Sequence, residues 1–203
     1  MSSHDIWYLT RASGLTAYGL LWVSVVWGLF KSLRLARSWP GAGTAFDLHE
    51  HVSLLALGFS LLHASILVAD REFGLSPFEL LVPFAPARQS RALGLGQIAL
   101  SLLVIVTTSH YVRKRIGQRT WRLLHLASFA VYALTLVHAL LAGTDSRSTG
   151  VRLLYLVSGG VVLFLTTYRA LSAFENQVRS YTSNSTPPAP VRRLTKRNPV
   201  GSK

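Results

Sequence analysis

Histidine is the residue type whose positions in this sequence point most directly to chemistry. Seven histidines occur among 203 residues, at positions 4, 49, 51, 63, 110, 125 and 138. His63 and His138 lie deep inside long apolar stretches, and His49 and His125 lie near one end of the same two stretches. An ionisable side chain at membrane depth is costly and is by default a functional candidate. Four such residues, two on each stretch, therefore outweigh the alternative of a histidine hydrogen-bonded between helices.

The elements that must position these histidines are apolar helices. Five stretches lack Asp, Glu, Lys and Arg: Ala12–Phe30, Val52–Ala69, Ala92–Val112, Leu123–Thr144 and Leu153–Tyr168. About 20 mostly apolar residues cross a bilayer as a helix, and in lipid each backbone polar group must be paired within the helix. We therefore predict an all-α integral membrane protein, a five-helix transmembrane bundle with spans at about 12–30, 50–69, 92–112, 122–144 and 152–172.

Charge predicts the orientation of these spans. The net charge is +13, with 21 Lys and Arg against 8 Asp and Glu. Most of the basic residues lie in the segments 31–48 and 113–122 and in the C-terminal tail, which share one side, and the positive-inside rule places that side in the cytoplasm. We expect a multi-pass plasma-membrane protein with an extracytoplasmic N-terminus (1–11), a transmembrane domain (12–174) and a disordered basic cytoplasmic tail (175–203). The basic groups are expected to contact membrane lipid rather than nucleic acid.

Helical spacing sorts the histidines into pairs. His49 and His63 are 14 residues apart, so they face within about 40° of each other and stand about 21 Å apart along the axis. His51 lies about 120° from His63 and is expected at the interface. His125 and His138 are 13 residues apart, about 19.5 Å of rise, but about 140° apart in an ideal helix. A tilt, a π-bulge or a lateral offset of the two side chains is needed to align them.

The two pairs predict a particular cofactor arrangement. The second and fourth spans run in the same direction, so His49 is level with His125 and His63 with His138. Two levels about 20 Å apart, each with two imidazoles, suit two stacked haems with two axial histidines each, whereas zinc needs its ligands to converge on one ion. Because the chain has no cysteine, both would be b-type haems. Two axial protein ligands favour electron transfer over chemistry at the metal, so we expect no separate catalytic residue.

Three segments resemble the ferric reductase-like transmembrane domain family: Leu9–Leu20, Leu48–Leu67 and Tyr111–Thr144. That family includes the haem core of NADPH oxidases and the membrane subunit of the periplasmic methionine sulfoxide reductase system. The resemblance covers about residues 8–172. In the family, paired histidines 14 apart on one helix and 13 apart on another hold two haems, which implies axial ligation by His49 and His125 at the inner level and His63 and His138 at the outer level.

The resemblance implies the membrane subunit of an oxidoreductase. Some family members continue into cytoplasmic domains that bind flavin and NADPH, and this sequence shows no such domains. We therefore expect electrons to come from a separate flavoprotein reductase or from quinol. The expected acceptor at the outer face is ferric iron, oxygen or an extracytoplasmic redox protein. The alternative is a non-redox membrane protein, such as a transporter or an assembly factor, with structural or proton-carrying histidines.

For a few other residues, the sequence leaves two roles possible or excludes a functional role. Arg11, at the outer end of the first span, is equally compatible with a topological role and with pairing to a haem propionate. His110 is expected at the interface. The pair Gly94 and Gly96 resembles part of a dinucleotide-binding fingerprint, but the third glycine is absent and the segment begins a membrane span, so we reject that interpretation.

Overall fold

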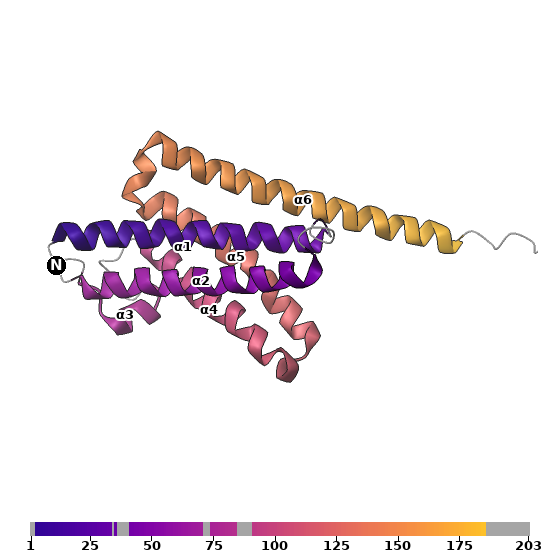
Figure 1. Cartoon of the computed structure of the whole chain (residues 1–203), viewed down its shortest axis with the longest axis horizontal. Coiled ribbons are helices and arrows are strands. Elements are labelled where there is room, and N and C mark those ends of the chain that lie inside the picture. Colours follow the sequence, from indigo (N-terminus) through magenta and orange to yellow (C-terminus); the bar gives the residue numbers. More distant parts are fainter. Residues whose placement is uncertain (1–2, 34, 36–40, 71–73, 85–90, 186–203) are drawn as a thin grey trace, which may run out of the picture. The chain divides into compact units, whose positions relative to one another are not determined.

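The structure is a computed structural model that describes residues 3–33, 35, 41–70, 74–84 and 91–185. Its elements are α1 (Ser3–Ser32), α2 (Ala42–Ala69), α3 (Pro77–Leu81), α4 (Arg91–Ile116), α5 (Gln118–Ala142), the 3-10 helix η2 (Thr144–Arg147) and α6 (Thr149–Ser185) (Figure 1). Five of these, all except α3 and η2, are long and apolar enough to cross a membrane. The prediction of an all-α protein with five candidate membrane spans is confirmed.

The surfaces of the long helices are apolar where they face outward. On α2, Leu55 and Leu62 are 52% and 48% exposed, and on α6 Leu163 and Phe164 are 69% and 68% exposed. Contiguous apolar surface of this kind is unusual on a protein in water and normally marks contact with a partner or a membrane. The exposed leucines therefore support membrane association.

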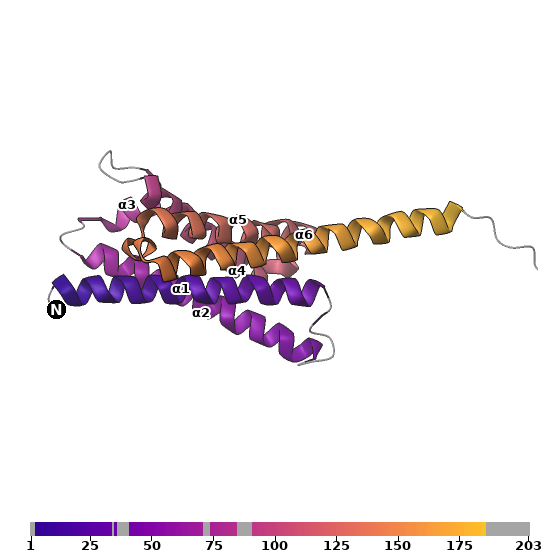
Figure 2. The same cartoon turned by 90° about the horizontal axis from the view of Figure 1, so that it is seen from above.

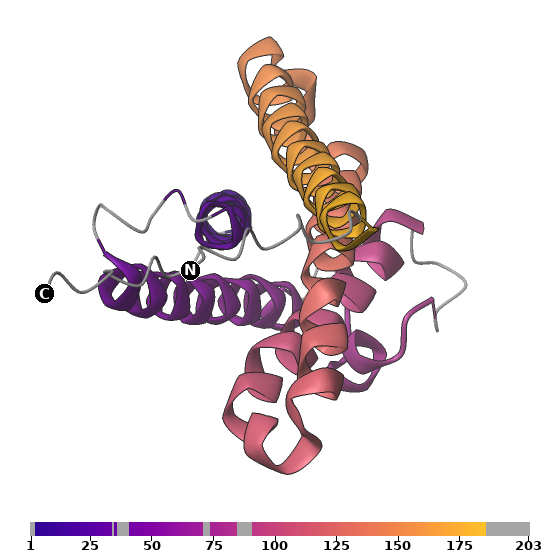
Figure 3. The same ribbon diagram turned by 90° about the vertical axis from the view of Figure 1, so that its right-hand side faces the viewer.

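Two antiparallel hairpins build the part of the fold that holds the histidines. Helix α1 packs along α2, and α4 packs along α5, while α2 touches α4 and α1 touches α5 (Figures 2 and 3). The link between α4 and α5 is the single residue Gly117, whose φ of 81° is a conformation that glycine adopts without a steric penalty. The hairpins present the two histidine-bearing helices, α2 and α5, to a shared interior.

A buried hydroxyl cluster joins α1, α5 and the first part of α6. The Tyr18 hydroxyl lies 2.5 Å from the Ser158 hydroxyl and 3.2 Å from the Tyr132 hydroxyl, and the Trp22 indole donates to the Ser158 carbonyl at 3.2 Å. Tyr18, Tyr132 and Ser158 are each at most 5% exposed. Polar side chains that are hydrogen-bonded between helices attach membrane helices to one another, and this cluster does so for α6.

We predict that Tyr18→Phe lowers the free energy of unfolding by about 1–2 kcal/mol, because it leaves the buried Ser158 and Tyr132 hydroxyls with one partner fewer. Thermal unfolding in detergent measures the change. The matched control is Tyr8→Phe, since Tyr8 is on the same helix but 62% exposed. An equal effect of the two substitutions would argue against the cluster as the attachment of α6.

The short helix α3 (Pro77–Leu81) lies between α2 and α4 in the chain. Ser76 and Glu79 cap this helix reciprocally, and Phe78 and Leu81 are 72% and 73% exposed. Phe84 has a positive φ of 63°. Its ring lies against α4 at Gly94, where an added Cβ would stand 2.1 Å from the ring. Gly94 is therefore a site of close approach by a side chain.

The C-terminal segment differs from the prediction. The chain divides into two units between residues 169 and 170. Helix α6 continues to Ser185, so residues 175–185, which were predicted to be disordered, are helical. An i,i+4 ion pair between Glu175 and Arg179, at 2.6 Å, supports the helix there. The remainder of the predicted tail, 186–203, lies outside the described residues.

Candidate functional site

Two cavities lie within the unit formed by residues 1–169, and each is lined by one histidine from α2 and one from α5. The first, about 390 Å³, is lined by His49 and His125, and we call it the His49 cavity. The second, about 320 Å³, is lined by His63 and His138, and we call it the His63 cavity. Leu103 of α4 lines both. Both volumes fall in the range of small-molecule and cofactor sites, roughly 300–1,000 Å³.

The two imidazoles in the His49 cavity are spaced as two ligands of one metal ion would be. Their ring centroids are 6.1 Å apart and the ring planes are at 83°. Imidazoles that bind a metal from opposite sides, each through a nitrogen about 2.0 Å away, have ring centres about 6 Å apart. Nδ1 of His49 is buried and makes no hydrogen bond of normal geometry. The pair fits a bis-histidine metal site.

In the His63 cavity, hydrogen bonds determine which ring nitrogen is available. Nδ1 of His63 lies 2.9 Å from the carbonyl of Thr10, and Nδ1 of His138 lies 2.7 Å from the carbonyl of Ala92. A carbonyl can only accept, so Nδ1 donates in both rings, and Nε2 is the ring nitrogen left for a ligand. Ligating histidines commonly donate their second ring nitrogen to a carbonyl in this way. Both rings are therefore held through Nδ1, which leaves Nε2 for ligation.

Three glycines make room for three of the four histidines. An added Cβ at Gly14 would lie 3.0 Å from the His63 ring, at Gly28 3.3 Å from the His49 ring, and at Gly96 2.8 Å from the His138 ring. By contrast, a Cβ at Gly19 or Gly58 would meet nothing within 4 Å. The glycines thus admit imidazoles that a larger residue would displace.

The glycines follow the register of the hairpins. Gly14 and Gly28 on α1 are 14 residues apart, as are His49 and His63 on the antiparallel α2. On α4, the residue 13 positions after Gly96 is Ser109, which is small and 4% exposed, matching the 13 residues from His125 to His138. The carbonyls that accept from His63 and His138 each lie four residues before the facing glycine. The two hairpins therefore position His63 and His138 in the same way, between a glycine and the carbonyl four residues before it.

The regularity of helix α5 excludes one of the ways in which histidines 13 residues apart could reach two sites. It is a continuous α-helix over Gln118–Ala142, without the π-bulge that was one of the possible repairs. His125 lines one cavity and His138 the other. With the π-bulge excluded, a tilt of the helix or a lateral offset of the two side chains remains to align them.

Two further histidines differ in their distance from these pairs: His51 lies away from them, and His110 lies beside one. His51 is exposed, and its Nδ1 bonds to the carbonyl of Asp47 in its own helix, at 2.7 Å. His110, expected only at the interface, does line the His49 cavity, where its ring packs against those of Phe46 and Trp121. Trp121 in turn stacks on His125, with centroids 5.3 Å apart. Nothing in the sequence spacing indicated this aromatic contact with a proposed ligand.

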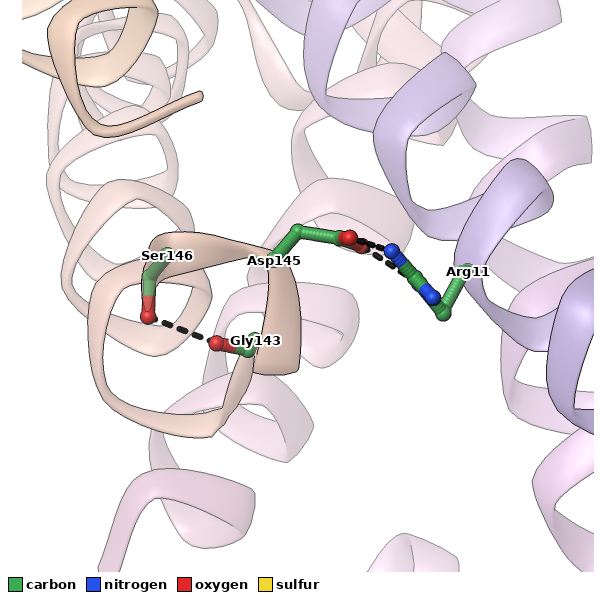
Figure 4. Close-up of polar contacts among 4 residues, drawn as sticks. All are labelled: Arg11, Gly143, Asp145 and Ser146. Atoms are coloured by element: carbon green, nitrogen blue, oxygen red, sulfur yellow. Dashed lines mark hydrogen bonds and ion pairs between the residues drawn. The ribbon is translucent and has the colours of Figure 1, made fainter. Parts of the chain in front are cut away.

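Arg11 has a protein partner. Its guanidinium forms a two-pronged ion pair with Asp145, Nε donating to Oδ2 at 2.7 Å and Nη2 to Oδ1 (Figure 4). The guanidinium carbon also lies 4.0 Å from the centre of the Trp7 ring. Arg11 and Asp145 both line the His63 cavity. The pair links the start of α1 to η2, beyond the end of α5.

A site with three or more ligands is not seen in the described part of the chain. Among those residues, no group of three or more His, Asp or Glu side chains is placed to hold a metal ion. The candidate ligands are therefore two imidazoles in each of two mainly apolar cavities.

The fold and these cavities define a class, a helical protein with five candidate membrane spans and paired histidines at two levels. The chain belongs to the family described as a domain of unknown function, DUF8596, which it matches over residues 5–145. That range includes all four paired histidines and the three facing glycines and ends at Asp145. No curated protein and no solved structure matches the chain.

Proposed function

We propose that this protein carries electrons across a membrane by means of two b-type haems. His49 and His125 would hold one, and His63 and His138 the other. The observation that carries the proposal is the presence of two cavities of similar volume, each lined by one histidine from α2 and one from α5. The resemblance to ferric reductase-like membrane domains points to the same ligands, and it supports the role of membrane subunit in an oxidoreductase.

Iron held between two imidazoles exchanges single electrons without binding a substrate, and this is the chemistry the group would supply. The chain's own residues do the positioning. The carbonyls of Thr10 and Ala92 hold Nδ1 of the outer histidines. The walls are mainly apolar and include Leu103, which lines both cavities and is 6% exposed. Such walls exclude water, and burial of this kind tunes a redox potential.

The charge distribution supports a direction for electron transfer. The His49 cavity is lined by Lys31, Arg122 and Arg169, at the end of the bundle that the positive-inside rule assigns to the cytoplasm. We propose that electrons enter there, from a flavoprotein reductase or a quinol, and leave near the His63 cavity. The acceptor would be ferric iron, oxygen or an extracytoplasmic redox protein.

An absorption spectrum of the purified full chain, before and after dithionite, tests the proposal. We expect the sharp reduced bands of low-spin b haem, and no change on adding carbon monoxide, because both axial positions would be occupied by histidine. Well-folded protein without a haem spectrum would leave the rival interpretation, a non-redox membrane protein.

NADPH alone should not reduce the purified chain. A dinucleotide site needs a phosphate-binding βα unit, whereas the elements of the described residues are helices. The Phe84 and His138 rings fill the space beside Gly94 and Gly96. Stopped-flow absorbance, with dithionite as the positive control, measures the rate. Rapid reduction by NADPH without a second protein would contradict this division of labour.

A further inference from the structure

The two cavities differ in the charges around them. The His49 cavity is lined by three cations from three helices, Lys31, Arg122 and Arg169, and by one carboxylate, Glu50. The His63 cavity is lined by one cation, Arg11, and two carboxylates, Asp70 and Asp145. The charges around the first cavity therefore favour an anionic ligand edge more than those around the second.

A buried donor at the His49 cavity also lacks an acceptor. The indole Nε1 of Trp121 is buried and has no hydrogen-bond partner among the described residues. Stacking on the His125 ring, at an interplanar angle of 21°, fixes the plane of the indole beside the cavity. Buried N–H groups are nearly always hydrogen-bonded in folded proteins. An acceptor atom of a ligand in the cavity would satisfy this one.

Glu50 does not neutralise this end of the cavity. Its carboxylate accepts a hydrogen bond from the Tyr111 hydroxyl at 3.3 Å. It is one negative charge against the three positive charges that line the same cavity. Lys31 has its Nζ over the Phe46 ring, 4.5 Å from the centroid. In the described part of the chain, no ion pair occupies Lys31, Arg122 or Arg169.

The opposite cavity has its cation already engaged. Asp145 takes both prongs of the Arg11 guanidinium (Figure 4). Arg–carboxylate forks are the strong, directional form of this interaction. A second carboxylate brought by a ligand would have to compete with Asp145.

From these contacts we infer that the His49 cavity recognises the carboxylates of its ligand, through the Trp121 indole and the guanidinium of Arg122, whereas the His63 cavity holds its ligand without them. The inference rests on the proposed function, in which the ligand is haem and the carboxylates are its two propionates. The acidic edge of the ligand then faces the basic end of the bundle, and each cavity has its own chemical requirement.

The test compares haem b with its dimethyl ester, in which both carboxylates are blocked. Full-length protein carrying His63→Ala and His138→Ala retains only the His49 site, and protein carrying His49→Ala and His125→Ala retains only the His63 site. Absorbance titration of each apoprotein gives the dissociation constants. We expect the ester to bind the His49 site at least about tenfold more weakly than haem, since a hydrogen-bonded charge is lost, and the His63 site to bind both about equally.

Point variants assign the effect to residues. In protein with only the His49 site, Trp121→Phe and Arg122→Gln should each reduce the preference for haem over its ester, while Arg119→Gln, an exposed residue of the same helix that does not line the cavity, should not. Equal binding of haem and ester at the His49 site would overturn the inference and leave the proposed function standing. Failure of haem to bind either protein would overturn both.

Discussion

Replacement of His63 or His138 by Ala should remove one haem from the protein and leave the other in place. Each residue lines only the His63 cavity, and an iron that loses one of two histidine ligands is held weakly. The haem content per chain should fall by about half, while the spectrum of the haem in the His49 cavity persists. His49→Ala and His125→Ala should have the reciprocal effect, which haem quantification together with low-temperature spectra measures.

Two histidines serve as controls for that experiment. His51→Ala should leave both haems bound, because His51 is exposed and bonded within its own helix. His110→Ala should also preserve the haem count, although a small spectral shift is expected because His110 packs on Trp121. If His51→Ala removed a haem and His49→Ala did not, the assignment of ligands on α2 would be wrong.

The second large effect is expected at the glycines. Gly96→Ala would place a Cβ 2.8 Å from the His138 ring, and that ring cannot easily retreat because its Nδ1 is bonded to the Ala92 carbonyl. Overpacking of this kind costs about 1–3 kcal/mol, which corresponds to about fivefold to 150-fold in affinity. We therefore expect Gly96→Ala to weaken haem binding in the His63 cavity specifically.

The other glycines should give a graded series. Gly14→Ala, with 3.0 Å to the His63 ring, should have a smaller effect on the same cavity, and Gly28→Ala, with 3.3 Å to the His49 ring, should mildly affect the other one. Gly19→Ala and Gly58→Ala are the matched controls, since a Cβ there meets nothing within 4 Å. Equal loss of haem in the controls would show that helix stability, rather than room for the imidazole, is responsible.

The all-helical fold could be predicted from the sequence because apolar runs of about 20 residues have few alternatives. The grouping of the histidines by level followed from helical rise and from the shared direction of the second and fourth spans. The way in which His125 and His138, 13 residues apart on a regular α-helix, reach two cavities could not be predicted, because it depends on how the two hairpins lie against each other. The helical extension of α6 to Ser185 was also missed, since a polar composition does not exclude a helix that continues from an apolar one.

The contacts that prepare the site are between residues far apart in the sequence. Gly96 faces a histidine 42 positions later, and Arg11 pairs with Asp145 across 134. One signal was present: Gly14 and Gly28 repeat the 14-residue interval of His49 and His63. Equal intervals on two antiparallel helices place a small residue opposite each large one. The sequence alone could not reveal this match, because it does not show that α1 and α2 pack together.

The number of haems per chain is the most direct test of the central claim that each cavity holds one haem between two histidines. A pyridine haemochromogen assay on purified full-length protein, normalised by amino-acid analysis, gives this ratio. We predict a value near two, with both haems low-spin and six-coordinate. A value near one, or none in well-folded protein, would contradict the claim.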